Sequence, residues 1–313
     1  MIFLMMRPDE RPYHIPVLLH RVLEGLNIRE DGTYVDLTFG GGGHASAILS
    51  RLGKKGRLIA MDQDPEASEN CRAFKDDPRF RFVASDFRYM EQQLYFLGIT
   101  EVHGILADLG LSSAHLDRNY RGFSYYSDDP PDMQMNPARA LNAGHIVNTY
   151  SPDELARIFL RYGEIRQAHK MAKTIEEARK KKPITSCRQL AEVILASRMK
   201  EKPERFLARA FQALRMEVND EIEALREMLQ QSERVLAPGG RLVVISYHSL
   251  EDREVKKFFR SEDVQEDPIT GKKIKKWKEI TSRPLQLDEK EIQHNPRARS
   301  AKLRIAEKIH NEQ

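Results

Sequence analysis

Four consecutive glycines stand in the segment DLTFGGGGHASAIL, between an apolar run and a run with helical spacing. Glycine weakens any regular element that it interrupts, so a cluster of four indicates a turn or a ligand close to the backbone. A glycine-rich turn from a strand to a helix directs backbone N–H groups and the positive end of the helix at a ligand. The segment therefore predicts a site for a nucleotide-like ligand at residues 36–44.

Two classes of ligand fit this turn. A dinucleotide fits because Gly40, Gly42 and Ala45 satisfy the loose nucleotide fingerprint, and Asp62 follows about 20 residues later. S-adenosylmethionine also fits, because it lies over a similar turn with its ribose held by an acid at the end of the second strand. The glycines alone leave both ligands open.

Aspartates close four of the expected strands. Asp36 lies within the first strand, where a dinucleotide site usually has apolar residues, and a buried carboxylate there needs hydrogen-bond donors. The ammonium group of a methionine-type ligand would supply them. Asp62, Asp86 and Asp108 extend this row along the carboxyl edge of a parallel sheet, where such folds bind ligands. Each aspartate alone is also explained as a turn or cap residue, but the row as a whole favours S-adenosylmethionine.

Short apolar runs alternate with helical runs over residues 32–108, which predicts a parallel sheet with helices on both faces. A long helical run, residues 211–236, ends at the turn signal APGG, and a fifth strand follows. Two further strands are expected to run antiparallel and to close the sheet. The seven expected strands cover residues 33–37, 56–62, 80–86, 102–110, the segment that begins at 241, 275–287 and 300–308.

An irregular stretch rich in Pro, Asp and Tyr interrupts this alternation at residues 116–148, and helices follow it. Residues 151–162 predict a helix that opens with a capping box between Ser151 and Glu154. Another helix is expected over residues 185–196. The expected fold is therefore α/β, with a mostly helical insert after strand four. The sheet domain is expected to cover residues 1–115 and 211–313, and the insert residues 116–210.

The composition excludes several classes of protein. No apolar run approaches the roughly 20 residues that a membrane span needs. The two cysteines, Cys71 and Cys187, cannot form a disulfide framework or a zinc site alone. We therefore expect a cytoplasmic protein with no membrane partner and no bound metal.

Positive charge is concentrated in two regions of the sequence. The net charge is +4, but residues 150–215 carry 16 Lys and Arg against 8 Asp and Glu, and residues 271–313 carry 12 against 6. The rest of the chain is acidic, with a net charge of −10. Two basic regions on an acidic body indicate a polyanionic partner, most simply a nucleic acid. Solvated helix faces are the alternative explanation.

The chain contains, in this order, the segments HIPVLL, DLTFGGGGH, DQDP, DLGLSSAHLD, RGFS, FQALR, GGRLVVISYHSLEDR and NPRARSAKLR. Together they resemble the bacterial ribosomal RNA small-subunit methyltransferase H family, also called the MraW family. The resemblance implies a class I (Rossmann-like) methyltransferase sheet with an inserted helical, substrate-recognition domain. It also implies that S-adenosylmethionine is used to methylate N4 of a decoding-site cytidine, position 1402 in conventional numbering, of 16S rRNA in the small ribosomal subunit.

The resemblance also implies which residues hold the cofactor. The family often has Gln at the position of His115, and an imidazole can form one hydrogen bond there as well. Asp36 is added to the expected cofactor residues because of its position in the first strand. The expected cofactor residues are Asp36, Gly42, Gly43, His44, Asp62, Phe87, Asp108 and His115.

Two segments differ from the family pattern. PPDMQM stands where the family has PLDMRM, with Pro131 and Gln134 at the changed positions, and RFLAR stands for HPATR, which leaves only Arg209. Both segments lie in or near the insert, where RNA is expected to bind. A divergent paralogue with another RNA target is therefore an alternative. A non-catalytic RNA-binding assembly factor and a nucleotide-linked oxidoreductase are others.

Methyl transfer from a sulfonium needs in-line geometry and no metal. A C5-cytosine methylase would need a cysteine nucleophile near the end of strand four or five, and neither cysteine lies there. An exocyclic amine can attack directly if another group accepts its proton. We expect Asp108, with Ser112 and Ser113, to orient this amine. His248 is a second candidate, and capping of the helix that starts at Ser249 is the alternative there.

Cations of the two basic regions are expected to contact RNA phosphates. Phe123, Tyr125 and Tyr126 either receive the unstacked target base or pack the insert against the core. The sequence does not define the oligomeric state, and a homodimer is left open. The cations expected at the RNA are Lys180, Lys181, Lys182, Arg209, Arg215, Arg297 and Arg299, together with Lys302 and Arg304.

Overall fold

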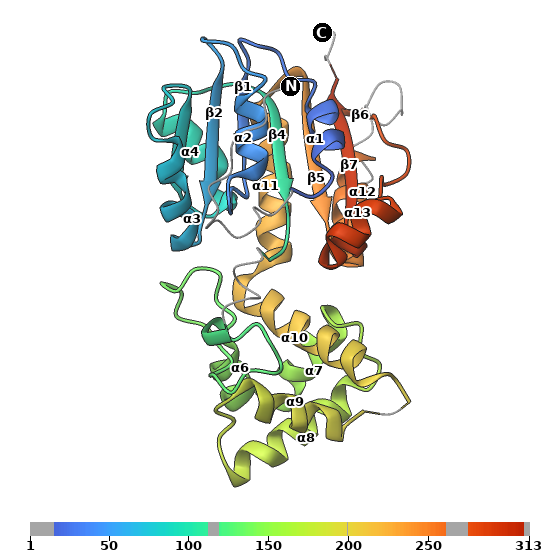
Figure 1. Cartoon of the computed structure of the whole chain (residues 1–313). Coiled ribbons are helices and arrows are strands. Elements are labelled where there is room, and N and C mark those ends of the chain that lie inside the picture. Colours follow the sequence, from blue (N-terminus) through green and yellow to red (C-terminus); the bar gives the residue numbers. More distant parts are fainter. Residues whose placement is uncertain (1–15, 112–118, 199, 261–274, 310–313) are drawn as a thin grey trace, which may run out of the picture. The chain divides into compact units, whose positions relative to one another are not determined.

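A computed structural model describes residues 16–111, 119–198, 200–260 and 275–309 of the chain. The chain divides into two compact units (Figure 1). The sheet unit comprises residues 1–110 and 226–313, and the helical unit comprises residues 111–225. The boundary expected between residues 210 and 211 falls inside helix α10 (Pro203–Asn219).

One seven-stranded sheet forms the centre of the sheet unit, and it contains all seven strands expected from the sequence. The strand order is β3-β2-β1-β4-β5-β7-β6. Strands β1 to β5 pair in parallel, while β7 pairs antiparallel with β5 and with β6. The strands are β1 (Thr33–Asp36), β2 (Arg57–Asp62), β3 (Phe80–Ala84), β4 (Val102–Asp108), β5 (Leu236–Ser246), β6 (Trp277–Glu279) and β7 (Lys302–Lys308).

Helices pack on both faces of this sheet: α1 and α2 lie over one face, and α11 lies behind the other (Figure 1). Val22, Leu26 and Ile48 are fully buried against Leu58 and Leu106 of the sheet. Burial of each such side chain contributes about 1.5 to 3 kcal/mol to the stability of the fold. The sheet therefore holds the loops at the ends of its strands in fixed positions. The helices and 3₁₀ turns of the unit are α1 (Leu19–Leu26), α2 (Gly43–Leu49), α3 (Pro65–Asn70), η1 (Cys71–Phe74), η2 (Phe87–Tyr89), α4 (Met90–Phe96), α11 (Glu221–Val235, which begins in the helical unit), α12 (Ser249–Phe259), α13 (Glu289–His294) and η4 (Pro296–Ser300).

Two details of the connection into β5 differ from the expectation. The long helical run breaks into α10 and α11 at Asp220, which adopts a left-handed conformation with φ of 52°. The APGG segment does not form a turn outside the strand. It lies within β5, where Gly239 has φ of 75° and the register with β4 shifts between Val102 and Gly104. The glycines thus accommodate a bulge at the start of the strand.

The helical unit consists of packed helices, as expected for the insert. Helix α7 begins with the expected capping box: the Glu154 N–H donates to Ser151 Oγ at 3.3 Å, and the Ser151 N–H donates to Glu154 Oε2 at 2.7 Å. Across both units, no helix in the described ranges is long and apolar enough to cross a membrane. The elements of the helical unit are η3 (Asn119–Arg121), α6 (Ala143–Thr149), α7 (Pro152–Arg161), α8 (Ala168–Lys181), α9 (Cys187–Ala196) and α10.

Candidate active site

Three of the four aspartates end parallel strands at one edge of the sheet. Asp36, Asp62 and Asp108 are the last residues of β1, β2 and β4. Strand β1 pairs with β2 on one side and with β4 on the other, so these acids flank the point where the strand order reverses. Ligands of open α/β sheets bind at such a switch point. Asp86 is used differently, because its side chain caps η2 by accepting from the Arg88 N–H at 3.0 Å.

The packing of the protein itself requires most of the glycine turn. Gly40 and Gly42 have left-handed backbones, with φ of 49° and 77°. A Cβ on Gly42 would lie 2.8 Å from Phe74, and a Cβ on Gly43 would lie 2.5 Å from Pro16. Gly41 differs, because it is exposed and a Cβ there would meet no atom within 4 Å. Gly41 is therefore the position in this turn where a ligand, rather than the packing of the described residues, would explain why glycine is present.

Alanine substitutions should distinguish a glycine that the packing of the protein requires from a glycine that a bound ligand requires. Gly42→Ala is expected to lower the free energy of unfolding by about 2 to 4 kcal/mol, because a left-handed backbone and a close contact both oppose a Cβ. Gly41→Ala is expected to change it by less than about 0.5 kcal/mol but to weaken binding of S-adenosylhomocysteine about tenfold or more. Urea denaturation and titration calorimetry measure the two effects. Undiminished binding by the Gly41 variant would contradict a ligand in contact with this turn.

Asp36 provides a direct test of whether a cationic ligand fits. Its side chain is 1% exposed, and Oδ1 accepts a hydrogen bond from the Thr38 N–H at 3.2 Å. Its Oδ2 is buried and has no hydrogen-bond partner among the described residues. Burial is the main cause that raises the pKa of this carboxyl to about 6. Buried polar atoms are normally hydrogen-bonded, so the ammonium group of S-adenosylmethionine fits this position.

Asp62 holds the glycine turn in place and retains capacity for a ligand. Its Oδ2 accepts from the Gly40 N–H at 2.8 Å, and its Oδ1 accepts from the Asp64 N–H at 2.9 Å. Each carboxylate oxygen accepts more than one hydrogen bond, so a ribose hydroxyl can be added. Phe87, the first residue of η2, is half-buried beyond the end of β3. The ribose and adenine contacts of these two residues remain predictions.

His44, in α2, lies close to Asp108 at the end of β4. His44 is 7% exposed and donates from Nε2 to the Val17 carbonyl at 3.1 Å. Its Nδ1 therefore carries a lone pair and lies 3.8 Å from Asp108 Oδ2. Burial lowers the pKa of His44 and is the main cause that raises the pKa of Asp108 to about 7. A neutral imidazole and a readily protonated carboxyl thus stand side by side.

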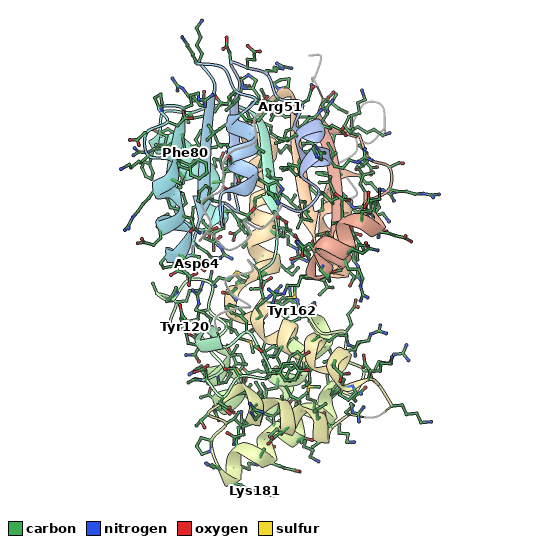
Figure 2. All side chains as sticks on the ribbon, viewed as in Figure 1. Arg51, Asp64, Phe80, Tyr120, Tyr162 and Lys181 are labelled. Carbon is green, nitrogen blue, oxygen red and sulfur yellow. The ribbon has the colours of Figure 1, made fainter. Side chains whose placement is uncertain are left out.

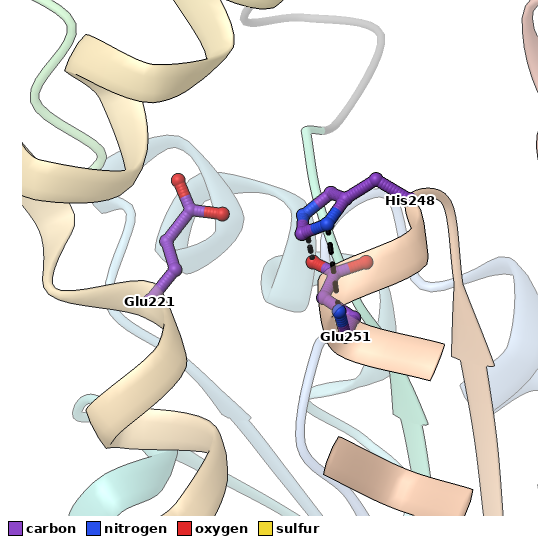
Figure 3. Close-up of side chains that lie close together, drawn as sticks. All are labelled: Glu221, His248 and Glu251. Atoms are coloured by element: carbon purple, nitrogen blue, oxygen red, sulfur yellow. Dashed lines mark hydrogen bonds and ion pairs between the residues drawn. The ribbon is translucent and has the colours of Figure 1, made fainter. Parts of the chain in front are cut away.

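Some expected catalytic residues lie elsewhere or cannot be placed. Ser112, Ser113 and His115 lie outside the described residues. His248, rather than Ser249, is the N-cap of α12, and its Nδ1 accepts from the Glu251 N–H at 3.5 Å. Figure 3 shows the imidazole turned toward the Glu251 carboxylate, with Nε2 at 2.9 Å from Oε1. These contacts give His248 a capping role, and its catalytic role remains a prediction.

Several of the cations expected at the RNA are paired with carboxylates. Three arginines are held in this way: Arg209 donates to Glu201 at 2.9 Å, Arg215 forms two hydrogen bonds of 2.7 Å with Glu221, and Arg304 donates to Asp252 at 2.6 Å. Two lysines are paired as well, Lys180 with Glu176 at 2.9 Å and Lys302 with Asp252 at 3.6 Å. The sequence shows the positive charge of these residues, but it does not show the carboxylates that pair with them. Arg297 and Arg299 in η4 and Lys302 in β7 belong to the sheet unit. Lys180, Lys181 and Lys182 are exposed at the C-terminal end of α8, where Figure 2 labels Lys181.

The three aromatic residues of the insert also differ in exposure. Phe123 is 7% exposed and thus belongs to the core. Tyr125 packs edge-on against Phe211, with ring centroids 5.7 Å apart. Tyr126 is 65% exposed. Packing within the helical unit therefore accounts for two of them, and Tyr126 is the one that is available to a base.

Sequence reasoning missed two side chains that hold Asp108. Tyr247 donates from its hydroxyl to Asp108 Oδ1 at 2.9 Å, and the Asp108 N–H donates to Thr38 Oγ1 at 2.7 Å. A signal was present in the sequence, because Tyr247 directly follows β5 and Thr38 lies two residues after the end of β1, and both strands are parallel neighbours of β4. Polar residues at such positions lie at the same edge as Asp108 and can reach it.

The fold and this edge together define a class of protein. A seven-stranded sheet with β7 alone antiparallel, a glycine turn after β1 and acids at the switch point are the features of a class I methyltransferase. A methyl donor bound at this edge, as in this class, would explain both the buried carboxylate of Asp36 and the open space over Gly41.

The chain belongs to the MraW methylase family, whose sequence model matches residues 11–309. The relative from Bacteroides thetaiotaomicron, named ribosomal RNA small subunit methyltransferase H, is 48% identical over 97% of this chain and 100% of its own length. The relative of the same name from Porphyromonas gingivalis is 49% identical over 96% and 99%. The solved rRNA methylase from Streptococcus thermophilus is more distant, with 12% identity and a TM-score of 0.39 over 97% of this chain and 100% of that one. S-adenosylmethionine is the methyl donor of the protein, as expected from the sequence.

Proposed function

We propose that the protein transfers a methyl group from S-adenosylmethionine to the N4 amine of a decoding-site cytidine of 16S rRNA in the small ribosomal subunit. The observation that carries the proposal is Asp36 Oδ2, a buried acceptor with no hydrogen-bond partner among the described residues, at the ligand edge of the sheet. The names of the relatives, which are small-subunit rRNA methyltransferases, support the choice of substrate. Such a substrate places the reaction in the cytoplasm.

The residues at the edge have distinct parts in this reaction. When bound, S-adenosylmethionine supplies a methyl group on a positively charged sulfur, which the amine takes as S-adenosylhomocysteine leaves. Asp36 holds the ammonium group of the donor, and Asp62 holds its ribose. Asp108 accepts the proton that the amine loses, at Oδ2, the oxygen that faces His44 Nδ1 at 3.8 Å. A pKa raised to about 7 suits this role, because a proton acceptor is most effective when its pKa lies near the working pH.

The two departures from the family pattern are compatible with this substrate. Gln134 is 7% exposed, and its side-chain amide donates to the Leu141 carbonyl at 3.0 Å. Pro131 is also buried, and Arg209 is paired with Glu201 inside the helical unit. The changed residues Phe206 and Leu207 are buried as well, whereas Arg205 and Ala208 are exposed. Most of the changed side chains therefore belong to the internal packing of the helical unit, and the two exposed ones lie on its surface.

The lysines at the end of α8 give a testable RNA surface. Replacing Lys180, Lys181 and Lys182 together by alanine should weaken RNA binding and make the slope of log affinity against log salt shallower by about 2. The reason is that three fewer phosphates are neutralised. A matched control removes three exposed cations at a distant point of the sequence, Arg51, Lys54 and Lys55. Filter binding at several salt concentrations should separate the two variants, and equal slopes would argue against this surface.

The proposed function is tested by labelled S-adenosylmethionine and small subunits from cells that lack this protein. The modified nucleotide is mapped by nuclease digestion and mass spectrometry. Label on N4 of the decoding-site cytidine is expected, and subunits from wild-type cells, already methylated, should accept none. Label on an adenine, or on protein alone, would refute the substrate assignment. Absence of label despite binding of the donor would indicate an assembly factor without activity.

A further inference from the structure

Tyr247 joins the ends of β4 and β5. It directly follows Ser246, the last residue of β5, and its hydroxyl donates to Asp108 Oδ1 at 2.9 Å. Its ring lies against Gly110, where a Cβ would approach Tyr247 Cδ2 to 3.3 Å. Gly110 also has φ of 100°, which favours glycine. The chain beyond β4 therefore leaves room for the tyrosine ring at Asp108.

The backbone of Tyr247 is fixed from the other side. Its N–H donates to Glu251 Oε2 at 2.9 Å, and the Glu251 residue is 3% exposed. The other carboxylate oxygen, Oε1, lies 2.9 Å from His248 Nε2 (Figure 3). Glu251 thus ties the first turn of α12 to the residue that carries the hydroxyl. This contact fixes the direction from which the hydroxyl meets Asp108.

The two oxygens of Asp108 consequently have different surroundings. Oδ1 is held by the Tyr247 hydroxyl, whereas Oδ2 faces His44 Nδ1 at 3.8 Å, beyond hydrogen-bond distance. Burial and the charge of Asp108 raise the pKa of Tyr247, so the phenol remains a donor. A hydrogen bond to the charged form of a carboxylate favours that form.

The charged groups around Asp108 come from several elements. Asp36 ends β1, His44 lies in α2, and Glu251 lies in α12. Burial is the largest cause that raises the pKa of Asp108, Glu251 adds to it, and the hydrogen bond from Tyr247 opposes both. Among these neighbours, the phenol is the group whose hydrogen bond lowers this pKa.

We propose that Tyr247 is a positioning residue for the methyl transfer: it occupies Oδ1 of Asp108, presents Oδ2 to the reacting amine and favours the charged form of the carboxylate. The inference rests on the proposed function, in which Asp108 accepts a proton. Tyr247 acts through Asp108 and takes no proton itself.

The test is Tyr247→Phe, which removes the hydroxyl and keeps the ring against Gly110. Aspartates labelled with ¹³C at the carboxyl are titrated by NMR, and Asp108→Asn identifies the signal of Asp108. Loss of one hydrogen bond to a charged acceptor should raise the pKa of Asp108 by about one to two units. The acid limb of kcat/KM for methyl transfer should move up by the same amount, with a loss of about tenfold at pH 7 that recovers above pH 9. Tyr95→Phe, on an exposed ring of α4, is the matched control and should change neither.

The results that would overturn this proposal differ from the result that would refute the proposed function. An unchanged pKa of Asp108 in Tyr247→Phe would overturn the proposal whatever the substrate is. A raised pKa with equal loss of rate at every pH would also overturn it, because a merely structural defect has that signature. A wild-type protein that transfers no methyl group to rRNA would refute the proposed function instead, and the NMR titration would still decide whether Tyr247 controls the charge of Asp108.

Discussion

Replacing Asp108 by asparagine is expected to lower the rate of methyl transfer about 100- to 10,000-fold, the usual contribution of a positioned proton acceptor. Asparagine has almost the same shape, and its carbonyl oxygen can still accept the hydroxyl of Tyr247, so the fold should remain. It cannot take a proton from the cytidine amine at neutral pH. The measurement is single-turnover transfer of labelled methyl to unmodified small subunits.

A second measurement on the same variant identifies the role of Asp108. If Asp108 is the proton acceptor, the affinity for S-adenosylhomocysteine should fall by no more than about tenfold while kcat collapses. An affinity that falls as much as kcat/KM, with kcat unchanged, would instead make Asp108 a ligand of the donor alone. Circular dichroism and urea denaturation check that the variant is folded. Unaltered turnover would remove Asp108 from the mechanism.

Asp36→Asn should have the next largest effect, and it should act on the donor. The substitution removes the negative charge that faces the ammonium group, and a hydrogen bond between charged partners contributes about 1.5 to 3 kcal/mol. The affinity for S-adenosylmethionine should therefore fall roughly 10- to 150-fold, as measured by calorimetry. Asp76→Asn, at an exposed acid of the same unit, is the control and should bind like the wild type. Unchanged affinity of Asp36→Asn would contradict the assignment of the ammonium contact.

The same variant should be more stable than the wild type without ligand. Burial raises the pKa of Asp36 from 3.8 to about 6 in the folded protein. The folded state therefore keeps a proton that the unfolded state loses within this range, and stability falls as the pH rises through it. The asparagine side chain of the variant does not titrate. Its advantage should reach up to about 3 kcal/mol above pH 6 and disappear below about pH 4. Urea denaturation at several pH values measures it, and an advantage that grows toward low pH would contradict the burial argument.

The strands and the capping box of α7 were predictable because their signals are local. Alternating apolar runs ended by aspartates indicated β1, β2 and β4, and Ser151 with Glu154 indicated the start of α7. The parallel pairing of these strands follows from the alternation of strands and helices. The site at the sheet edge followed in turn, since the ends of parallel strands meet there.

The parts that were missed have no clear signal in the order of the residues. Asp220 breaks the long helical run although no glycine or proline marks the position. The pairing of Arg215 with Glu221 removes a cation from the expected RNA surface, and composition cannot reveal that pairing. Tyr247 reaches Asp108 across 139 positions of sequence. These features become visible only when the side chains are placed.

The central claim is that the methyl donor binds at the carboxyl edge of the sheet, over the glycine turn. The most direct test is a crystal structure of the protein with saturating S-adenosylhomocysteine. We expect density for its ammonium group within hydrogen-bond distance of Asp36 Oδ2, and for its ribose hydroxyls at Asp62. Density at another location, or a turn that remains without ligand while NAD binds there instead, would contradict this assignment.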